Sequence, residues 1–361
     1  MEFSRDRISM RQATIFFIMA LGAPSLRIIP NYVARDAERA GWLSAIIELV
    51  PALLLVWILA TLFKRDEGSL YDIYEKVFGK VINKCLTVVY IVWSLCLTGL
   101  YLRMFGERFL ETILFESNLF AIMAFMAVFI YFLVNQKIDV IGRICEILIY
   151  FLMGIVLVVF FTILSQIDLK NIWPVTHYDI LPALKGVIPL MTLSSYITAV
   201  MFLGDKISDV RNIKKTGTAV MIGWSIFAII LILSTIGVFG HRLNEQLLFP
   251  YFATLKNIRI LDAVERVESL FISVWVGADV VIITLFSLIT LNLIRRLFNK
   301  QSHKKFSLWV IAAAFIIAII FAPNAYEAET VARIYAAPIN LILFTLVPFL
   351  AVIVGKIRKV I

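Results

Sequence analysis

Long apolar segments separated by short polar ones follow one another along the whole chain. A helix that crosses the hydrocarbon core of a bilayer needs about 20 consecutive, mostly apolar residues. The pattern predicts ten such helices, at residues 12–33, 41–63, 81–102, 119–135, 144–165, 183–203, 218–240, 266–294, 306–323 and 336–355. We therefore expect an all-α integral membrane protein with a single membrane domain, residues 1–361, and no sizeable soluble domain.

Two of the predicted helices contain residues that interrupt helices. In the first helix these residues are Gly22 and Pro24, within the stretch ALGAPSL. In the sixth helix they are Gly186, Pro189, Ser194 and Ser195. Glycine adds backbone freedom, and proline both lacks an N–H group and clashes with the preceding turn. These helices open two five-helix halves, about 12–165 and 183–355, and interrupted helices at corresponding positions are typical of inverted-repeat transporters. The alternative is that both are ordinary kinked membrane helices.

An interrupted helix has a chemical use inside a membrane protein. Backbone N–H and C=O groups without intrahelical partners cost several kcal/mol each in lipid, so they must face a partner or a cavity. Helix N-termini attract carboxylates, whereas free carbonyl groups attract ammonium groups. An amino acid carries both charges and would match two interruptions that face each other near the membrane centre.

The composition agrees with a bilayer environment, since 61% of the 361 residues are hydrophobic and only 16% are charged. A soluble protein of this size would leave too much apolar surface in water. The formal net charge of +9 comes from an excess of lysine and arginine. These residues are about twice as frequent on the side of the N-terminus as on the opposite side, a bias that marks the cytoplasmic face. The charge therefore predicts cytoplasmic termini and attraction to anionic lipid rather than nucleic-acid binding.

Cofactor and metal chemistry finds no support in the sequence. Cys85, Cys96 and Cys145 lie in apolar segments without metal-binding or redox spacing, and His177, His241 and His303 fall in separate loops. Buried free cysteine is the usual state of such residues. There is no glycine-rich phosphate loop and no nucleophile–base arrangement. We therefore expect no cofactor, no bound metal and no enzymatic activity.

Three stretches carry a resemblance to a known family: MALGAPSLRIIP near the start, GWLSAIIELVPALL in the second predicted helix, and LLFPYFATLKNIRILDAVERVESLFISVW at 247–275. The chain resembles the B subunit of bacterial spore germinant receptors, and the resemblance extends over essentially its full length. These subunits are permease-like and belong to the amino acid–polyamine–organocation superfamily. The resemblance implies a LeuT-like fold of two inverted five-helix repeats.

The same resemblance implies a function, a location and partners. The protein would lie in the inner membrane of the dormant spore, with a larger membrane A subunit and a lipoprotein C subunit. It would sense a small nutrient germinant, often an amino acid, in a transporter-like pocket and so trigger germination. Two alternatives stay open: a proton- or sodium-coupled amino acid permease, and a structural subunit with a vestigial pocket. The fifth predicted helix has no lysine to act as a built-in coupling cation, which disfavours the first alternative.

The resemblance also implies a ligand pocket among the first, third, sixth and eighth helices. Carried onto this sequence, the pocket residues are Leu21, Gly22, Ala23, Pro24, Trp93, Leu97, Ser194, Ser195, Tyr196, Asp279 and Ile282. Pro24 stands where the family commonly has a second glycine, and the loss of that N–H donor puts the ligand preference in doubt. Trp93 and Leu97 are four residues apart and share a helix face, which is equally typical of core packing.

Polar residues inside the predicted helices have both a functional and a structural interpretation. Asp279 lies well inside the eighth helix, where a carboxylate by default indicates a functional site. Binding of an ammonium group, a cation or a proton and pairing with a basic residue all stay open for it. Ser194 and Ser195 either contact the ligand or bond back to their own helix. For Glu48 we expect a structural hydrogen bond, and an ion network or subunit contact is expected for Glu265, Arg266 and Glu268.

Overall fold

The computed structural model describes residues 6–64, 68–112, 116–256, 264–300, 302, 304–320 and 324–361, without the side chains of residues 28, 264–270 and 325. In this part of the chain nearly every residue is helical, and β pairing is confined to one bridge between Ile8 and Ile207. The α-helices are α1 (Met10–Ala37), α2 (Gly41–Leu62), α3 (Leu70–Phe78), α4 (Lys80–Thr112), α5 (Leu119–Val134), α6 (Ile138–Ile163), α7 (Ile180–Ser194), α8 (Tyr196–Val200), α9 (Ile213–Asn244), α10 (Pro250–Lys256), α11 (Val264–Leu297), α12 (Lys304–Ile320), α13 (Ala325–Thr330), α14 (Ala337–Leu341) and α15 (Val347–Ile357). Short 3₁₀ turns lie at Glu38–Ala40, Leu164–Gln166, Leu169–Asn171, His177–Asp179, Met201–Lys206 and Val210–Asn212, and π-helical turns at Val331–Ala336 and Ile342–Leu346.

Each of the ten predicted membrane spans coincides with a helix or with a run of consecutive helices. The sixth span is α7 with α8 and the 3₁₀ turn that follows, and the tenth is the run from α13 to α15 with its π-helical turns. By length and composition, seven helical segments of the described chain can cross a membrane, and α5 is a shorter apolar helix. The prediction of an all-α, multi-pass membrane protein is therefore confirmed.

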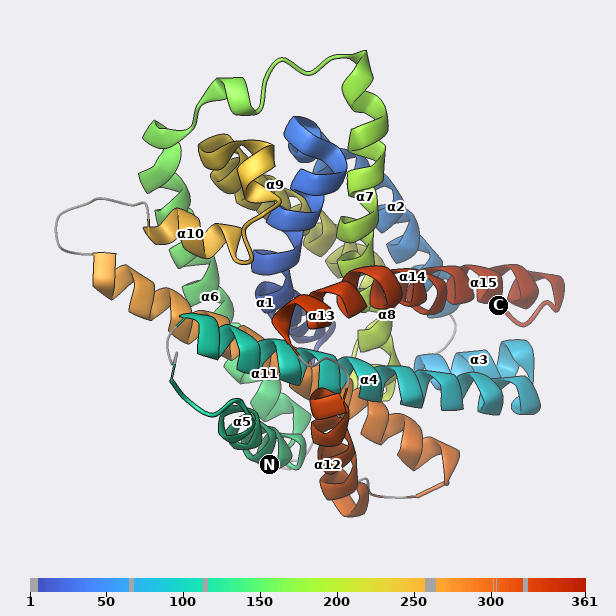
Figure 1. The fold of residues 1–361 in the computed structure, drawn as a ribbon. Helices are drawn as coiled ribbons and strands as arrows, with labels where there is room; N and C mark the ends of the chain where they lie inside the picture. Colours follow the sequence, from blue (N-terminus) through green and yellow to red (C-terminus); the bar gives the residue numbers. More distant parts are fainter. Residues whose placement is uncertain are drawn as a thin grey trace.

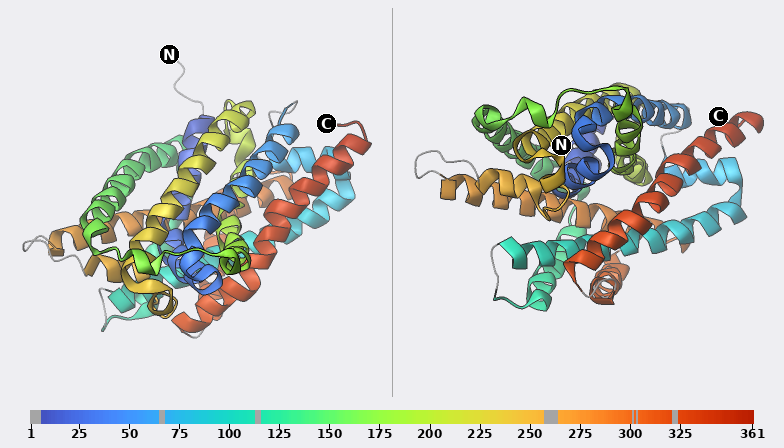
Figure 2. Two further views of the ribbon diagram at one scale, coloured as in Figure 1. Left: turned by 90° about the horizontal axis from the view of Figure 1, so that it is seen from above. Right: turned by 45° about the horizontal axis from the view of Figure 1, so that its top comes forward.

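The helices form a bundle and, crossing it, a pair made of α4 and α11. α1, α2, α7 and α9 pack against one another as one bundle, and α11 packs against α1. α4 and α11 lie side by side and run across this bundle (Figure 1). The final run from α13 to α15 extends past α4 and α3 to α2 (Figure 2). As a result, α1, α4, α7, α8, α11 and α14 all border the same central region.

The first predicted helix is not interrupted, which corrects the expectation from Gly22 and Pro24. α1 is one continuous α-helix of 28 residues with Pro24 inside it. The Ser25 hydroxyl donates to the Gly22 carbonyl oxygen at 2.9 Å. The Trp275 indole N–H of α11 donates to the Ala23 carbonyl oxygen at 3.3 Å. These two bonds add donors to carbonyl groups beside Pro24. Neither of them goes to the Ala20 carbonyl oxygen, which is the one that Pro24 leaves without its helical donor.

Gly22 serves close helix packing rather than backbone freedom. A Cβ atom on Gly22 would lie 3.0 Å from Cβ of Ala278 on α11 and 3.2 Å from Cδ2 of Leu152 on α6. Both distances are shorter than ordinary van der Waals contacts, so α1 reaches these helices because residue 22 has no side chain. Small residues commonly allow helices in membranes to approach closely.

Large apolar side chains cover the outward faces of α5 and α6. Phe125 and Phe132 on α5, and Tyr150 and Phe161 on α6, are each more than half exposed. In water, exposed apolar surface costs about 25 cal/mol per Å², whereas acyl chains solvate such a surface readily. These faces are therefore suited to contact with lipid.

Candidate ligand-binding site

The sixth predicted helix contains a one-residue irregularity rather than a break, because Ser195 keeps helical backbone angles, φ −61° and ψ −20°. α7 ends at Ser194 and α8 begins at Tyr196, with Ser195 between them. The Ser195 hydroxyl donates to the Thr192 carbonyl oxygen at 2.6 Å, and the Thr192 hydroxyl donates to the backbone one turn earlier. Side chains that bond back to their own helix compete with the backbone ladder and bend the helix. The irregularity follows Pro189 by about one and a half turns and lies directly before Tyr196.

Tyr196 belongs to a chain of hydrogen bonds that connects three helices. Its hydroxyl lies 2.8 Å from the Tyr101 hydroxyl of α4 and accepts from the Asn340 side-chain amide of α14, also at 2.8 Å. Asn340 Oδ1 in turn accepts from the Trp93 indole N–H at 2.8 Å. Tyr101, Tyr196 and Asn340 are buried. Buried polar groups need partners, and here they supply them to one another.

Aromatic rings hold these hydroxyl groups in place. Phe286 of α11 stacks on Tyr101 with ring centres 5.9 Å apart and meets the Tyr196 ring nearly at right angles at 4.9 Å. Phe344 also meets the Tyr196 ring edge-on, at 5.9 Å. Stacked and edge-to-face rings are the preferred arrangements of aromatic pairs. The polar groups therefore sit in a rigid apolar frame.

A small cavity borders the two tyrosine hydroxyl groups. Its volume is about 20 Å³, and its lining includes Tyr32 of α1, Pro189 and Thr192 of α7, and Asn340. A cavity of about this volume admits one water molecule, whereas ligand pockets measure roughly 300–1,000 Å³. Binding of an amino acid at this position therefore requires the surrounding side chains or helices to move apart.

A larger polar cavity, of about 550 Å³, lies near the end of α1, and its lining includes Arg35, Glu245 and Glu329. The Tyr32 hydroxyl, which borders the small cavity, donates to the Glu329 carbonyl oxygen at 3.1 Å. The Glu329 carboxylate also pairs with Arg27 of α1 at 3.3 Å. Glu329 therefore lies between the small cavity and the large one.

The predicted pocket residues of α4 and α11 lie along the same central region. Trp93 and Leu97 precede Tyr101 at a spacing of four, so the three share one face of α4. Ile282 lies one turn before Phe286 on α11. Leu97 and Ile282 are both buried. The predicted residues of α1, namely Leu21, Gly22, Ala23 and Pro24, are all buried within the continuous helix.

Ser194 points toward α2 rather than toward the tyrosines. Its hydroxyl makes a short hydrogen bond with Oε1 of Glu48 and lies 3.1 Å from the Leu190 carbonyl oxygen. The structural hydrogen bond expected for Glu48 is thus confirmed. One turn earlier on α2, the Ser44 hydroxyl donates to the Ala183 carbonyl oxygen at 2.8 Å. Two side chains on one face of α2 therefore fasten α7.

Asp279 pairs with Arg108 of α4. The two side chains approach to 2.8 Å, and each is less than one-tenth exposed. The Arg108 guanidinium also lies over the Trp275 ring, 4.3 Å from its centre, which adds a cation–π attraction. Pairing with a basic residue was one of the alternatives left open for Asp279, and Arg108 is that residue. The pair neutralises both charges without a charged ligand.

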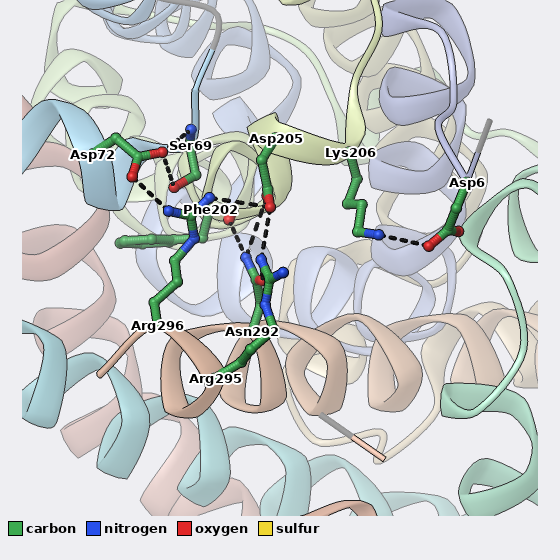
Figure 3. A network of polar contacts seen from close by, with 9 residues as sticks. All are labelled: Asp6, Ser69, Asp72, Phe202, Asp205, Lys206, Asn292, Arg295 and Arg296. Carbon is green, nitrogen blue, oxygen red and sulfur yellow. Dashed lines mark hydrogen bonds and ion pairs between the residues drawn. The ribbon is translucent and has the colours of Figure 1, made fainter. Parts of the chain in front are cut away.

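A second polar network lies at the other end of α1. Two neighbouring arginines of α11, Arg295 and Arg296, both pair with Asp205 after α8, at 2.8 and 3.0 Å. The further ion pairs drawn in Figure 3 are Arg296–Asp72, which holds α3, and Lys206–Asp6, which holds the segment before α1. Ion pairs therefore fix the chain that leaves α8 to α11 and to the segment before α1, and they fix α11 in turn to α3.

No metal site accompanies these networks: across the described side chains, no group of three or more His, Cys, Asp or Glu residues is placed to hold a metal ion. The ion network expected for Glu265, Arg266 and Glu268 lies outside the described side chains.

Sequence reasoning missed Tyr101, Phe286 and Asn340. Tyr101 continues the face of Trp93 and Leu97 by one more turn, so the spacing of four was an available signal. Asn340 lies between the π-helical turns Val331–Ala336 and Ile342–Leu346. Such turns are frequent at functional sites, but no pattern in the sequence announces them.

The arrangement of the helices defines an all-α membrane protein with a LeuT-like fold. The chain is similar to the crystal structure of MhsT in complex with L-phenylalanine, with a TM-score of 0.67 and 13% identity over 94% of this chain and 89% of that chain. It is also similar to a manganese transporter of Eremococcus coleocola, with a TM-score of 0.61 and 12% identity over 93% of this chain and 74% of that chain. The predicted LeuT-like fold is thereby confirmed.

Residues 7–327 match the family model described as spore germination protein, and the chain belongs to that family. It is 22% identical to spore germination protein KB of Bacillus subtilis (strain 168), over 98% of this chain and 97% of that protein. It is 24% identical to spore germination protein YndE of the same strain, over 75% and 76%, and 22% identical to spore germination protein GerQB of Bacillus cereus, over 69% and 68%. The resemblance to the permease-like B subunits of germinant receptors is confirmed, and the family and fold are those of permeases and receptors rather than enzymes.

Proposed function

We propose that this protein is the nutrient-sensing B-type subunit of a spore germinant receptor. A small germinant, in the simplest case an amino acid, binds where α4, α8 and α14 meet and thereby triggers germination. The observation that carries the proposal is the hydrogen-bonded chain Trp93–Asn340–Tyr196–Tyr101, in which all residues but Trp93 are buried. It gathers hydrogen-bond donors and acceptors at the centre of a transporter fold, where a polar ligand can exchange partners with them.

Ligand access would come from the larger polar cavity at the end of α1. Movement of Glu329 away from Tyr32 would join that cavity to the small one, and the pocket would widen to the size of an amino acid. Leu97 and Ile282 would then contact the ligand side chain, together with the predicted residues of α1. The charged end of the ligand would meet the hydroxyl and amide groups rather than Asp279, which Arg108 already neutralises.

The proposed setting follows from the family. The protein would lie in the spore inner membrane with both termini on the core side, in agreement with the roughly twofold excess of basic residues on that side. Its partners would be the larger membrane A subunit and the lipoprotein C subunit. Two observations on similar proteins support a nutrient-linked role: the relatives are named spore germination proteins, and MhsT was solved with L-phenylalanine.

The proposal is tested by changing the size of the pocket. Differences of one methylene in an apolar pocket are worth about 1–3 kcal/mol, so Leu97→Ala and Ile282→Ala should change the relative potency of nutrients by roughly tenfold or more. The assay is germination of spores across amino acids, nucleosides and sugars, beside spores deleted for this subunit. An unchanged order of potency would place recognition elsewhere in the receptor.

A second measurement separates sensor from permease. Purified protein in vesicles is supplied with labelled nutrient and an imposed proton or sodium gradient. A sensor binds the nutrient without uphill uptake, whereas robust gradient-driven accumulation would establish the coupled permease instead.

A further inference from the structure

Glu48 is fully buried within α2, and no charged side chain accompanies it. Its Oε1 atom contacts the Ser194 hydroxyl, and its Oε2 atom has no hydrogen-bond partner among the described residues. α2 packs against α1, α7, α9 and α15. In the described parts of these helices no charged or titratable side chain acts on Glu48. The nearby polar groups are Ser194 on α7 and Ser225 on α9, and the latter donates to the Ala45 carbonyl oxygen. An ionised carboxylate is costly in such surroundings.

Ser194 gives independent information on the hydrogen that Glu48 carries. The Ser194 oxygen lies within hydrogen-bond distance of two acceptors, Oε1 of Glu48 and the carbonyl oxygen of Leu190. A serine hydroxyl has a single hydrogen to donate. If that hydrogen goes to Leu190, then the hydrogen between Ser194 and Glu48 belongs to Glu48. A protonated carboxyl group satisfies both contacts: Glu48 donates to Ser194, and Ser194 donates to Leu190.

We propose that Glu48 is a proton-binding site at the contact between α2 and the last turn of α7. With the proton bound, the hydrogen bonds run from Glu48 through Ser194 to Leu190. When the carboxyl group loses its proton to water, Glu48 becomes an acceptor only. The Ser194 hydrogen then turns to Glu48, and the Leu190 carbonyl oxygen loses its side-chain donor.

The consequence is local because Ser194 is the last residue of α7 and Tyr196 is the first of α8. The change in hydrogen bonding therefore takes place two residues before Tyr196, whose hydroxyl belongs to the proposed ligand site. The proton site stands on the geometry of α2 and α7 alone. Its effect on germinant binding rests on the proposed function, so the two are tested separately.

Infrared difference spectroscopy on the full-length purified protein in lipid nanodiscs tests the proton directly. The probe is the C=O stretching band of an undissociated carboxylic acid, compared between the wild-type protein and Glu48→Gln at neutral pH. We expect a band that is present in the wild type, absent in Glu48→Gln, and lost from the wild type as the pH is raised. Ser44→Ala is the matched control, because Ser44 lies one turn away on the same face of α2 and its loss should leave the band in place.

Carboxylate bands for Glu48 at neutral pH would overturn the proposal, and so would a band that disappears when sodium replaces choline at constant pH.

Thermal unfolding supplies the second readout. Glutamine can still donate to Ser194, so at low pH the unfolding temperature of Glu48→Gln should be close to that of the wild type. At high pH it should be higher than that of the wild type. Glu48→Ala should unfold at a lower temperature than the wild type at every pH. Equal losses for Glu48→Gln and Glu48→Ala at low pH would contradict a donated hydrogen bond from Glu48.

Discussion

The hydroxyl groups of Tyr101 and Tyr196 lie 2.8 Å apart in the core, although 95 positions separate the two residues along the chain. Tyr101 belongs to α4, and Tyr196 is the first residue of α8. Asn340 of α14 donates to the same Tyr196 hydroxyl. One side chain therefore connects three helices at the junction of α7 and α8, and a ligand that contacts it would act on all three.

Replacing the Tyr196 hydroxyl should weaken the nutrient response. In Tyr196→Phe the ring still packs on Phe286, but the Asn340 amide loses its acceptor, at a cost of about 1–3 kcal/mol. We expect normal abundance of the protein and roughly a tenfold higher nutrient concentration for half-maximal germination. Immunoblots of spore membranes and dose–response curves measure the two quantities.

Tyr178→Phe is the control for this change, since Tyr178 is 79% exposed and should respond like the wild type. If Tyr196→Phe spores germinate at the wild-type nutrient concentration, the hydroxyl chain takes no part in recognition.

A side chain at residue 22 should push α1 away from α11. Gly22→Leu places atoms where Ala278 and Leu152 already lie, and overpacking of this kind costs about 1–3 kcal/mol. Gly22→Ala should cost less and should be relieved by Ala278→Gly in the double variant. Thermal unfolding in detergent gives the order of stabilities.

Gly154→Ala is the matched control, because no atom lies within 4 Å of a Cβ at that position. It should leave the stability unchanged or raise it slightly, by up to about 1 kcal/mol, since alanine favours the helix over glycine. A Gly22→Leu protein as stable as the wild type would show that the close approach of α1 is not required.

Removing the charge of Asp279 should destabilise the protein through Arg108. Asp279→Asn leaves a buried guanidinium without its counter-ion, and breaking a buried pair costs about 3–5 kcal/mol. We expect a lower unfolding temperature and less protein in the membrane. Arg108→Gln combined with Asp279→Asn should recover a large part of the loss.

The double variant also distinguishes a structural role from a binding role. If Asp279 holds the germinant or an ion directly, Asp279→Asn will be abundant but insensitive to nutrient, and the second substitution will restore nothing. Stability and dose–response measured on the same preparations decide between the two results.

The network after α8 should contribute a modest, salt-sensitive stabilisation. Asp205→Asn weakens the pairs with both Arg295 and Arg296, whose side chains are about one-fifth exposed. Partial exposure screens such pairs, so we expect a loss of about 1 kcal/mol at low salt that shrinks as salt is added. Arg143→Ala breaks an ion pair in which the arginine is 73% exposed and should have almost no effect. If the two substitutions change the stability equally, the network does not contribute to the stability of the protein.

Several features were predictable because they depend on neighbouring residues alone. The apolar segments indicated where the long helices lie, since crossing a bilayer needs a minimum run of apolar residues. Ser194 and Ser195 after Pro189 indicated a local irregularity in the sixth span, because their hydroxyl groups compete with the helix backbone. The same local reasoning was wrong for Gly22 and Pro24.

The outcome at α1 was decided by helices that lie far away in the sequence. Trp275 supplies a donor beside Pro24, and Ala278 and Leu152 occupy the space that Gly22 leaves. The pairing of Asp279 with Arg108 likewise depends on two helices that are distant in the sequence. A sequence determines which segments are helical and apolar, but whether a helix breaker is satisfied, and which buried charge finds which partner, depends on the helices that tertiary packing brings alongside.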